Sequence, residues 1–146
     1  MKEFKVFEEI KLQDQLLAMI LRNNFSKPGV SFFTPNNFSQ QLAFMNHPIG
    51  KVIEPHVHNI VKREVQVTQE VLILKKGKLR VDFYDDDKNY FKSVILNPGD
   101  VILLASGGHG FKVLEEIDMI EIKQGPYKGD IDKTRIPSIE DENVVF

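Results

Sequence analysis

Two of the four histidines in this chain stand two positions apart, in the sequence His56-Val57-His58. Alternate side chains of a β-strand point to the same face, so both imidazoles can face one side of a strand. Two neutral imidazoles on one face can bind a divalent metal ion, because imidazole is the commonest protein ligand for such ions. A solvent-exposed pair at a strand end is the alternative, and the spacing alone leaves both open.

Further residues with ligand or turn chemistry follow this pair in a characteristic order. They are Gly50, Glu70, Gly77, the turn Asn97-Pro98-Gly99-Asp100 and His109. With the histidine pair, this order resembles the two conserved motifs of the cupin superfamily, over residues 50–114. In that family the motifs supply two histidines, a glutamate and a third histidine to one metal. The resemblance therefore implies four ligands, namely His56, His58, Glu70 and His109.

The pattern departs from the usual cupin spacing in two places. Eleven residues separate His58 from Glu70, more than is usual in the family, and the segment leading to His109 is slightly short and lacks the common proline. A longer loop adds little closure entropy, so neither change forbids a site. His47, beside Pro48, lies outside both motifs and is interpreted as an ordinary loop histidine.

Three imidazole nitrogens and one carboxylate favour particular metals. Such a set suits one divalent transition metal (Fe, Mn, Zn, Ni or Co) better than magnesium or calcium. In an octahedral site, four protein ligands leave two positions for water or substrate, which is the condition for metal-assisted chemistry. A metal-free barrel whose histidines only line a pocket is the alternative.

A second resemblance lies in residues 120–135. There the chain is similar to the segment that closes the cupin domain of type II mannose-6-phosphate isomerases. The matching positions are Gly125, Tyr127, Gly129, Asp130, Asp132 and Arg135. This resemblance implies a ligand of the sugar phosphate or nucleotide-sugar class. A turn followed by a local Asp132–Arg135 ion pair would explain the same residues structurally.

The expected function is that of a metal-dependent enzyme of the isomerase or epimerase type acting on a small polar molecule. Arg63, Arg80 and Lys123 are the candidate cations for a substrate phosphate. Alternation along residues 79–84 does not decide which face Arg80 takes. Glu64 and Tyr127 are the candidate general bases. An iron-dependent dioxygenase and a non-catalytic metal- or sugar-binding module are the alternative functions.

Short segments rich in branched and aromatic residues recur from residue 30 onward and predict strands. They lie at residues 30–33, 41–45, 51–53, 64–68, 71–74, 79–84, 91–96, 101–104, 111–114 and 119–122. Such spacing, with turn signals and no intervening helices, indicates an all-β fold, a small antiparallel β-barrel of the cupin or jelly-roll type. Apolar residues at helical spacing predict one N-terminal helix over residues 7–21. The expected organisation is a helical arm (1–29), a barrel (30–136) and a tail (137–146).

Composition limits the partners. The 146 residues carry a formal net charge of -2 and no cysteine. Nucleic-acid binding needs a basic face, and a membrane span needs about 20 apolar residues, so neither partner is expected. The absence of cysteine excludes disulfides and thiolate zinc sites. The expectation is a cytoplasmic homodimer that binds a small-molecule ligand.

Overall fold

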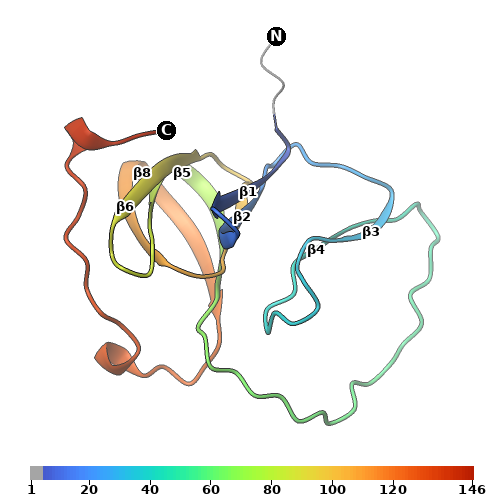
Figure 1. The fold of residues 1–146 in the computed structure, drawn as a ribbon. Helices are drawn as coiled ribbons and strands as arrows, with labels where there is room; N and C mark the ends of the chain where they lie inside the picture. The colour runs from blue at the N-terminus through green and yellow to red at the C-terminus, as the bar shows by residue number, and fades with distance from the viewer. Residues whose placement is uncertain (1–4) are drawn as a thin grey trace. The chain divides into compact units, whose positions relative to one another are not determined.

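The computed structural model describes residues 5–146 and divides them into two compact units (Figure 1). The first unit contains residues 5–25 and Thr68–Phe146, and the second contains Ser26–Val67. Residues 1–4 of the predicted N-terminal arm lie outside the described residues. No helix in the described part of the chain has the length and apolar character needed to cross a lipid bilayer.

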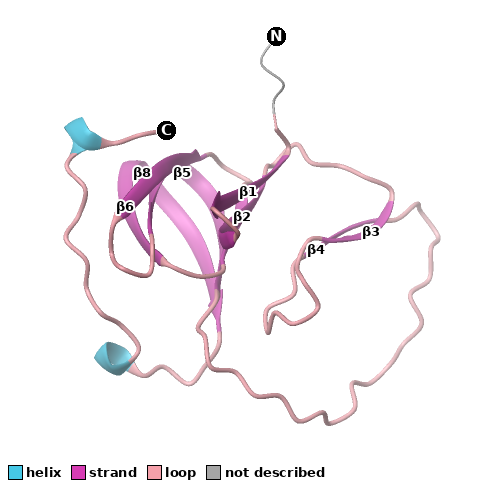
Figure 2. Cartoon of the chain, viewed as in Figure 1, coloured by secondary structure: helices cyan, strands magenta, loops and turns pink. Residues whose placement is uncertain are grey.

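The first unit is built on one antiparallel sheet that curls into a half-barrel (Figures 1 and 2). Its strands are β1 (Phe7–Leu12), β2 (Gln15–Leu21), β5 (Glu70–Tyr84), β6 (Tyr90–Leu96), β7 (Val101–Leu104) and β8 (Gly108–Lys123). The strand order is β1-β2-β7-β5-β6, and β8 pairs with β5. Two short 3-10 helices follow, η1 (Gly129–Ile131) and η2 (Asp141–Asn143). The predicted all-β antiparallel class is confirmed.

β5 and β8 form a long two-stranded ribbon that bends sharply near its middle. Glu70 pairs with Lys123 at one end of the ribbon. Between Leu74 and Leu79 the pairing register shifts repeatedly, and such bulges bend a strand and increase its twist. Gly77 lies in this bend with φ +83°, and a β-carbon there would collide with the backbone oxygen of Glu116. The bend therefore requires glycine at this position.

The hydrophobic core lies inside the curled sheet. It is formed by Ile10, Leu17, Ala18, Ile20, Leu72, Leu74, Leu79, Val81, Phe83, Val94, Leu96, Ile102 and Leu104. Full burial of one such side chain stabilises the fold by about 1.5–3 kcal/mol, so this cluster holds the sheet in its curled form. Its buried members come from β1, β2, β5, β6 and β7, and β8 adds the partly buried Ile117 and Met119, which pack against them.

The predicted N-terminal helix is wrong. Residues 7–21 form the hairpin β1–β2, whose turn contains Gln13 at φ 54°. β2 lies between β1 and β7 in the sheet, and its five residues from Leu17 to Leu21 are all buried. A strand that is covered on both faces carries a continuous apolar run, and in a short segment such a run also matches helical spacing.

Several predicted strands also change their limits. The segments predicted at 71–74 and 79–84 belong to one strand, β5, and those at 111–114 and 119–122 belong to β8. The second unit contains one hairpin, formed by β3 (Gly29–Phe32) and β4 (Ala43–Asn46). Residues 51–53 and 64–68 contain no strand, contrary to the prediction.

Candidate functional site

Glu70 and His109 contact each other in the first unit. His109 Nε2 lies 3.3 Å from Glu70 Oε2; the Glu70 side chain is 11% exposed and the His109 side chain 30% exposed. In the strand register they belong to opposite ends of the β5–β8 ribbon, because Glu70 pairs with Lys123 whereas His109 pairs with Phe83. The curl of the ribbon therefore creates this contact between residues far apart in the ladder.

The surroundings of Glu70 favour its ionised form. A hydrogen bond donated by His109 lowers the pKa of the Glu70 carboxyl, and this outweighs the opposing effect of burial. Electrostatic attraction to a protonated His109, to Lys123 and to Lys133 lowers the pKa further. Glu70 is consequently a carboxylate at neutral pH, the form in which it can bind a cation or accept hydrogen bonds from hydroxyl groups.

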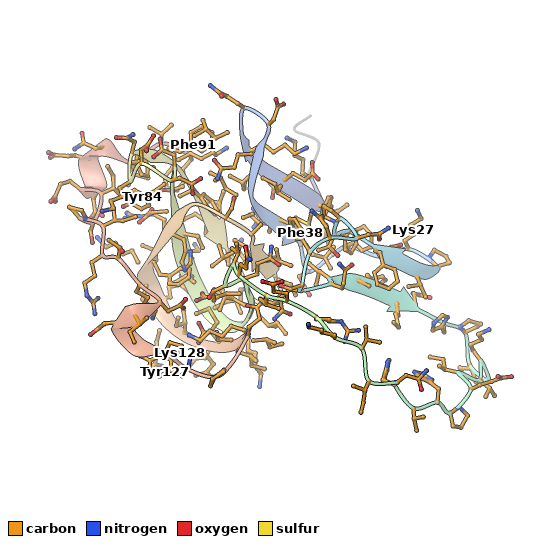
Figure 3. The ribbon with its side chains drawn as sticks, turned by 60° about the horizontal axis from the view of Figure 1, so that its bottom comes forward. Lys27, Phe38, Tyr84, Phe91, Tyr127 and Lys128 are labelled. Atoms are coloured by element: carbon orange, nitrogen blue, oxygen red, sulfur yellow. The ribbon has the colours of Figure 1, made fainter. Side chains whose placement is uncertain are left out.

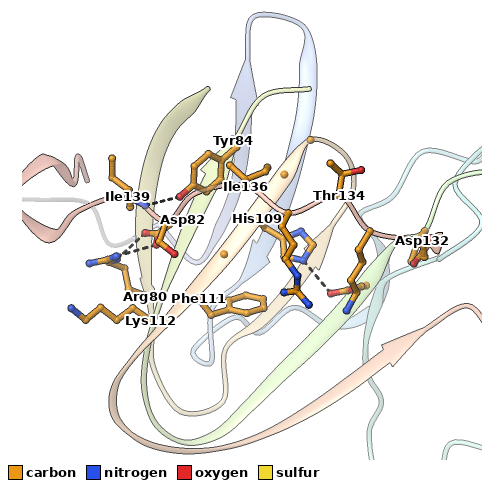
Figure 4. Close-up of a pocket in the computed structure, with 18 of the residues that line it drawn as sticks. Arg80, Asp82, Tyr84, His109, Phe111, Lys112, Asp132, Thr134, Ile136 and Ile139 are labelled. Atoms are coloured by element: carbon orange, nitrogen blue, oxygen red, sulfur yellow. Dashed lines mark hydrogen bonds and ion pairs between the residues drawn. The ribbon is translucent and has the colours of Figure 1, made fainter. Parts of the chain in front are cut away.

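This pair lines a cavity of about 760 Å³ in the first unit (Figure 4). The β5–β8 ribbon supplies one wall, and residues 132–141, which follow β8, supply much of the other. Polar and charged side chains predominate in the lining, including Thr68, Glu121, Asp132, Lys133 and Arg135. Binding cavities for small molecules have similar volumes, about 300–1,000 Å³, so a sugar-sized polar molecule fits here.

A second group of charged side chains lines the same cavity around Arg80. The Arg80 guanidinium donates two hydrogen bonds to Asp82, of 2.8 and 3.0 Å, and a third of 2.9 Å to Asp141. Asp82 is buried and also accepts a hydrogen bond from the Ser93 hydroxyl. The hydrogen bond with Asp82 is the main reason that the pKa of Arg80 is raised, so Arg80 is permanently charged.

Three further residues of the cavity wall, Asp82, Tyr84 and Asp141, were not predicted as site residues. The alternation Leu79-Arg80-Val81-Asp82-Phe83-Tyr84 contains the signal for two of them, since it places Arg80, Asp82 and Tyr84 on one strand face. Tyr84 accepts a hydrogen bond from the backbone of Ile139, which holds the C-terminal segment against the sheet. Nothing in the sequence links Asp141 to Arg80, because 61 positions separate the two residues.

His56 and His58 lie in the second unit on an extended, exposed segment. Their ring centroids are 5.1 Å apart with the planes at 75°, and His56 Nδ1 lies 2.9 Å from the backbone oxygen of Glu54. The two imidazoles are thus neighbours on a segment that is not a strand. Arg63 and Glu64 follow on the same exposed stretch, where Glu64 accepts a hydrogen bond from Gln66.

Lys123, the last residue of β8, and Tyr127, in the loop that follows, form a separate pair. Lys123 Nζ lies 5.6 Å from the centroid of the Tyr127 ring, a cation–π contact. Tyr127, which is labelled in Figure 3, is largely exposed. The suggested local ion pair between Asp132 and Arg135 is replaced by other contacts. Asp132 accepts a hydrogen bond from the Thr68 hydroxyl, and Arg135 lies 4.0 Å from Asp130.

The four implied metal ligands thus occur as two pairs, each within one unit. Glu70 and His109 offer an oxygen and a nitrogen donor, and His56 and His58 offer two nitrogen donors, which is chemistry suited to a transition metal. Within residues 5–146, no group of three or more His, Asp or Glu side chains is arranged to hold a metal ion.

No protein-family model matches the chain, and neither the curated proteins nor the solved structures include a significant match to it.

Proposed function

We propose that this chain is a cupin-type, metal-dependent isomerase or epimerase that acts on a small polar molecule of the sugar phosphate or nucleotide-sugar class. One observation carries the proposal. Glu70 and His109, two of the four ligands that the cupin resemblance implies, contact each other in the wall of a polar cavity. Because they come from opposite ends of the β5–β8 ribbon, their contact depends on the curl of the whole sheet.

The chemistry of the cavity wall supports a hydroxylated, anionic ligand. The carboxylates of Glu70, Glu121 and Asp132 can accept hydrogen bonds from sugar hydroxyls, and Lys133 and Arg135 add positive charge to the wall, which attracts an anionic ligand. A bound transition metal would supply Lewis-acid polarisation of a carbonyl or hydroxyl oxygen. The Glu70–His109 contact holds an oxygen donor and a nitrogen donor side by side, as two ligands of one metal must lie.

A non-catalytic binding module is the second candidate, and the position of Tyr127 favours it. This candidate base is largely exposed in the loop after β8, and it does not occur among the described residues that line the cavity. The other candidate base, Glu64, is hydrogen-bonded to Gln66 on the exposed stretch of the second unit. A barrel that holds a sugar derivative without converting it needs neither group.

Metal content tests the proposal most directly. We would measure it by plasma mass spectrometry in the purified wild-type chain and in the variants Glu70→Gln/His109→Ala and His56→Ala/His58→Ala. The His47→Ala variant is the matched control, because His47 lies outside both motifs. We expect near-stoichiometric metal in the wild type and in the control, and loss in both double variants. Equal metal content in all four proteins, or none after reconstitution, would refute the metal site.

Product formation separates the enzyme from the binding module. The metal-loaded wild type would be incubated with a panel of sugar phosphates and nucleotide sugars and followed by NMR spectroscopy in deuterated water. An isomerase or epimerase that moves a proton incorporates deuterium at the reacting carbon. Saturable binding without product or deuterium would support the module.

A further inference from the structure

One carboxylate in the cavity wall bridges two cations. Asp141, in η2, accepts a hydrogen bond from Arg80 through one oxygen, at 2.9 Å, and contacts Lys112 Nζ through the other. These contacts are the largest reasons that the pKa of the Asp141 carboxyl is lowered, with the Lys112 contact first. Asp141 is therefore ionised and lies where the donors of two basic side chains converge (Figure 4 shows Arg80 and Lys112).

The two carboxylates around Arg80 differ in how firmly they are held. Asp82 is buried, is bound twice by Arg80, and accepts a third hydrogen bond from Ser93. The Asp141 side chain is 64% exposed and the Lys112 side chain is 46% exposed. Exposed ion pairs contribute little to stability because water and salt screen them, so the Asp141 carboxylate is the replaceable partner.

Charge balance shows what would take its place. Arg80 and Lys112 carry two positive charges, which Asp82 and Asp141 neutralise. If the Asp141 carboxylate turns away, one positive charge is no longer neutralised. The donors of Arg80 and Lys112 that contacted Asp141 then lack an acceptor. A phosphate oxygen satisfies the same donors, because arginine and lysine bind phosphates and carboxylates through similar contacts.

The backbone of the C-terminal segment can remain in place during this exchange. The Ile139 N–H donates to the Tyr84 hydroxyl at 3.0 Å, and the Val145 carbonyl accepts from the Ser93 N–H at 2.7 Å. The segment is thus fixed on both sides of Asp141. Rotation of one exposed side chain is enough to open the position.

We propose that Arg80 and Lys112 form the phosphate subsite of the cavity, and that Asp141 occupies this subsite until the phosphoryl group of a ligand replaces it. The inference rests on the proposed function, because it assigns the phosphoryl group of the proposed sugar phosphate to one end of the cavity. The Glu70–His109 pair lines the same cavity, so it would face the sugar part of the ligand.

Calorimetric titration of the full chain with inorganic phosphate, and separately with a sugar phosphate, tests the subsite. The Asp141→Asn variant removes the competing charge and keeps the shape. We expect it to bind inorganic phosphate about three- to tenfold more tightly than the wild type, because phosphate no longer competes with one exposed ion-pair partner. Adding Lys112→Gln should abolish this gain. Glu142→Gln, which neutralises the exposed neighbour on the same segment, is the matched control and should change the affinity less than about twofold.

Equal phosphate affinity in the Asp141→Asn variant and the wild type would overturn the subsite, as would a gain of the same size in the Glu142→Gln control. Thermal unfolding of each variant verifies folding, and all three substituted side chains are largely exposed. Failure of the subsite is distinguishable from failure of the proposed function, because metal content does not depend on phosphate binding. A tighter response to the sugar phosphate than to inorganic phosphate would show that the sugar part is also bound.

Discussion

Glu70 links protonation to stability in the metal-free protein. Its pKa is lowered in the folded state, chiefly by the hydrogen bond from His109. A group with a depressed folded-state pKa stabilises the fold above its unfolded pKa, and this contribution is lost as the pH falls through the folded-state value. We therefore expect the advantage of the wild type over Glu70→Gln to be greatest at neutral pH and to disappear in acid.

Urea unfolding with a chelator present, repeated from neutral to strongly acidic pH, measures this difference. Glu116→Gln is the matched control, because that glutamate is exposed and pairs only at the surface with Lys76. A difference between the wild type and Glu70→Gln that stays constant over the whole pH range would contradict the linkage.

Cross-strand partners in the ribbon should differ sharply in their contribution to stability. Leu79 and Val113 are paired in the register of β5 and β8, yet Leu79 is fully buried whereas Val113 is 52% exposed. We expect Leu79→Ala to lower the free energy of unfolding by about 2–5 kcal/mol, because it leaves a cavity in the core. Val113→Ala should cost less than about 1 kcal/mol. Similar losses in chemical denaturation would place Val113 in the core as well and contradict the burial.

The candidate site shows how far the contacts of single residues could be predicted from the sequence. Motif spacing selected Glu70 and His109, which lie at opposite ends of the ribbon in the register and contact each other because the ribbon curls. The charge of Arg80 also suggested an anion clamp. Strand alternation places its partner Asp82 on the same face, but its partner Asp141 was not predictable, since this contact joins the sheet to the C-terminal segment across 61 positions. Local alternation cannot encode such a contact.

Among the elements, the bend of the β5–β8 ribbon depends on Gly77. This residue has a positive φ, and any side chain there would meet the backbone of Glu116. Gly129 also has a positive φ, but an added β-carbon there finds only an ordinary contact with Tyr127. Gly129→Ala should therefore cost only the backbone strain, about 1–2 kcal/mol. Gly77→Ala should cost about 1–3 kcal/mol more, because the collision forces the backbone to shift.

Thermal and chemical denaturation of the two glycine variants measure this difference. The same bend brings Glu70 to His109, so Gly77→Ala should also weaken metal or ligand binding in whatever fraction remains folded. Equal destabilisation by the two substitutions would show that the strand can relax around an alanine at the bend.

The strand predictions succeeded where local sequence and pairing agree. β6 and β7 lie close to their predicted limits because turn residues bound each of them. Residues 7–21 were misinterpreted because the buried run in β2 matches both periods, and only its place between β1 and β7 decides between them. Residues 51–53 and 64–68 have strand-forming composition but no strand. Strand propensity reflects how well side chains pack against neighbouring strands, and these two segments have no neighbouring strand to pair with.

At the scale of the whole molecule, the chain enters the first unit twice. Residues 5–25 and Thr68–Phe146 build one sheet, and the second unit, Ser26–Val67, is inserted between them. The core cluster draws on β1 and β2 before the insertion and on β5, β6 and β7 after it. The first unit should therefore fold without the inserted residues.

Replacing residues 26–67 by a flexible Gly/Ser linker of half that length tests this independence. Halving a flexible loop lowers its closure entropy cost by about 0.6 kcal/mol, so the shortened chain should unfold cooperatively at the same temperature as the wild type or a few degrees higher. Loss of a cooperative calorimetric transition would mean that the second unit is required for the first to fold. The same protein retains Glu70 and His109 but lacks His56 and His58. If the proposed function is right, its metal content should fall below that of the wild type, and full metal retention would exclude the histidine pair as ligands. Phosphate binding should persist, because Arg80, Lys112 and Asp141 all lie in the first unit.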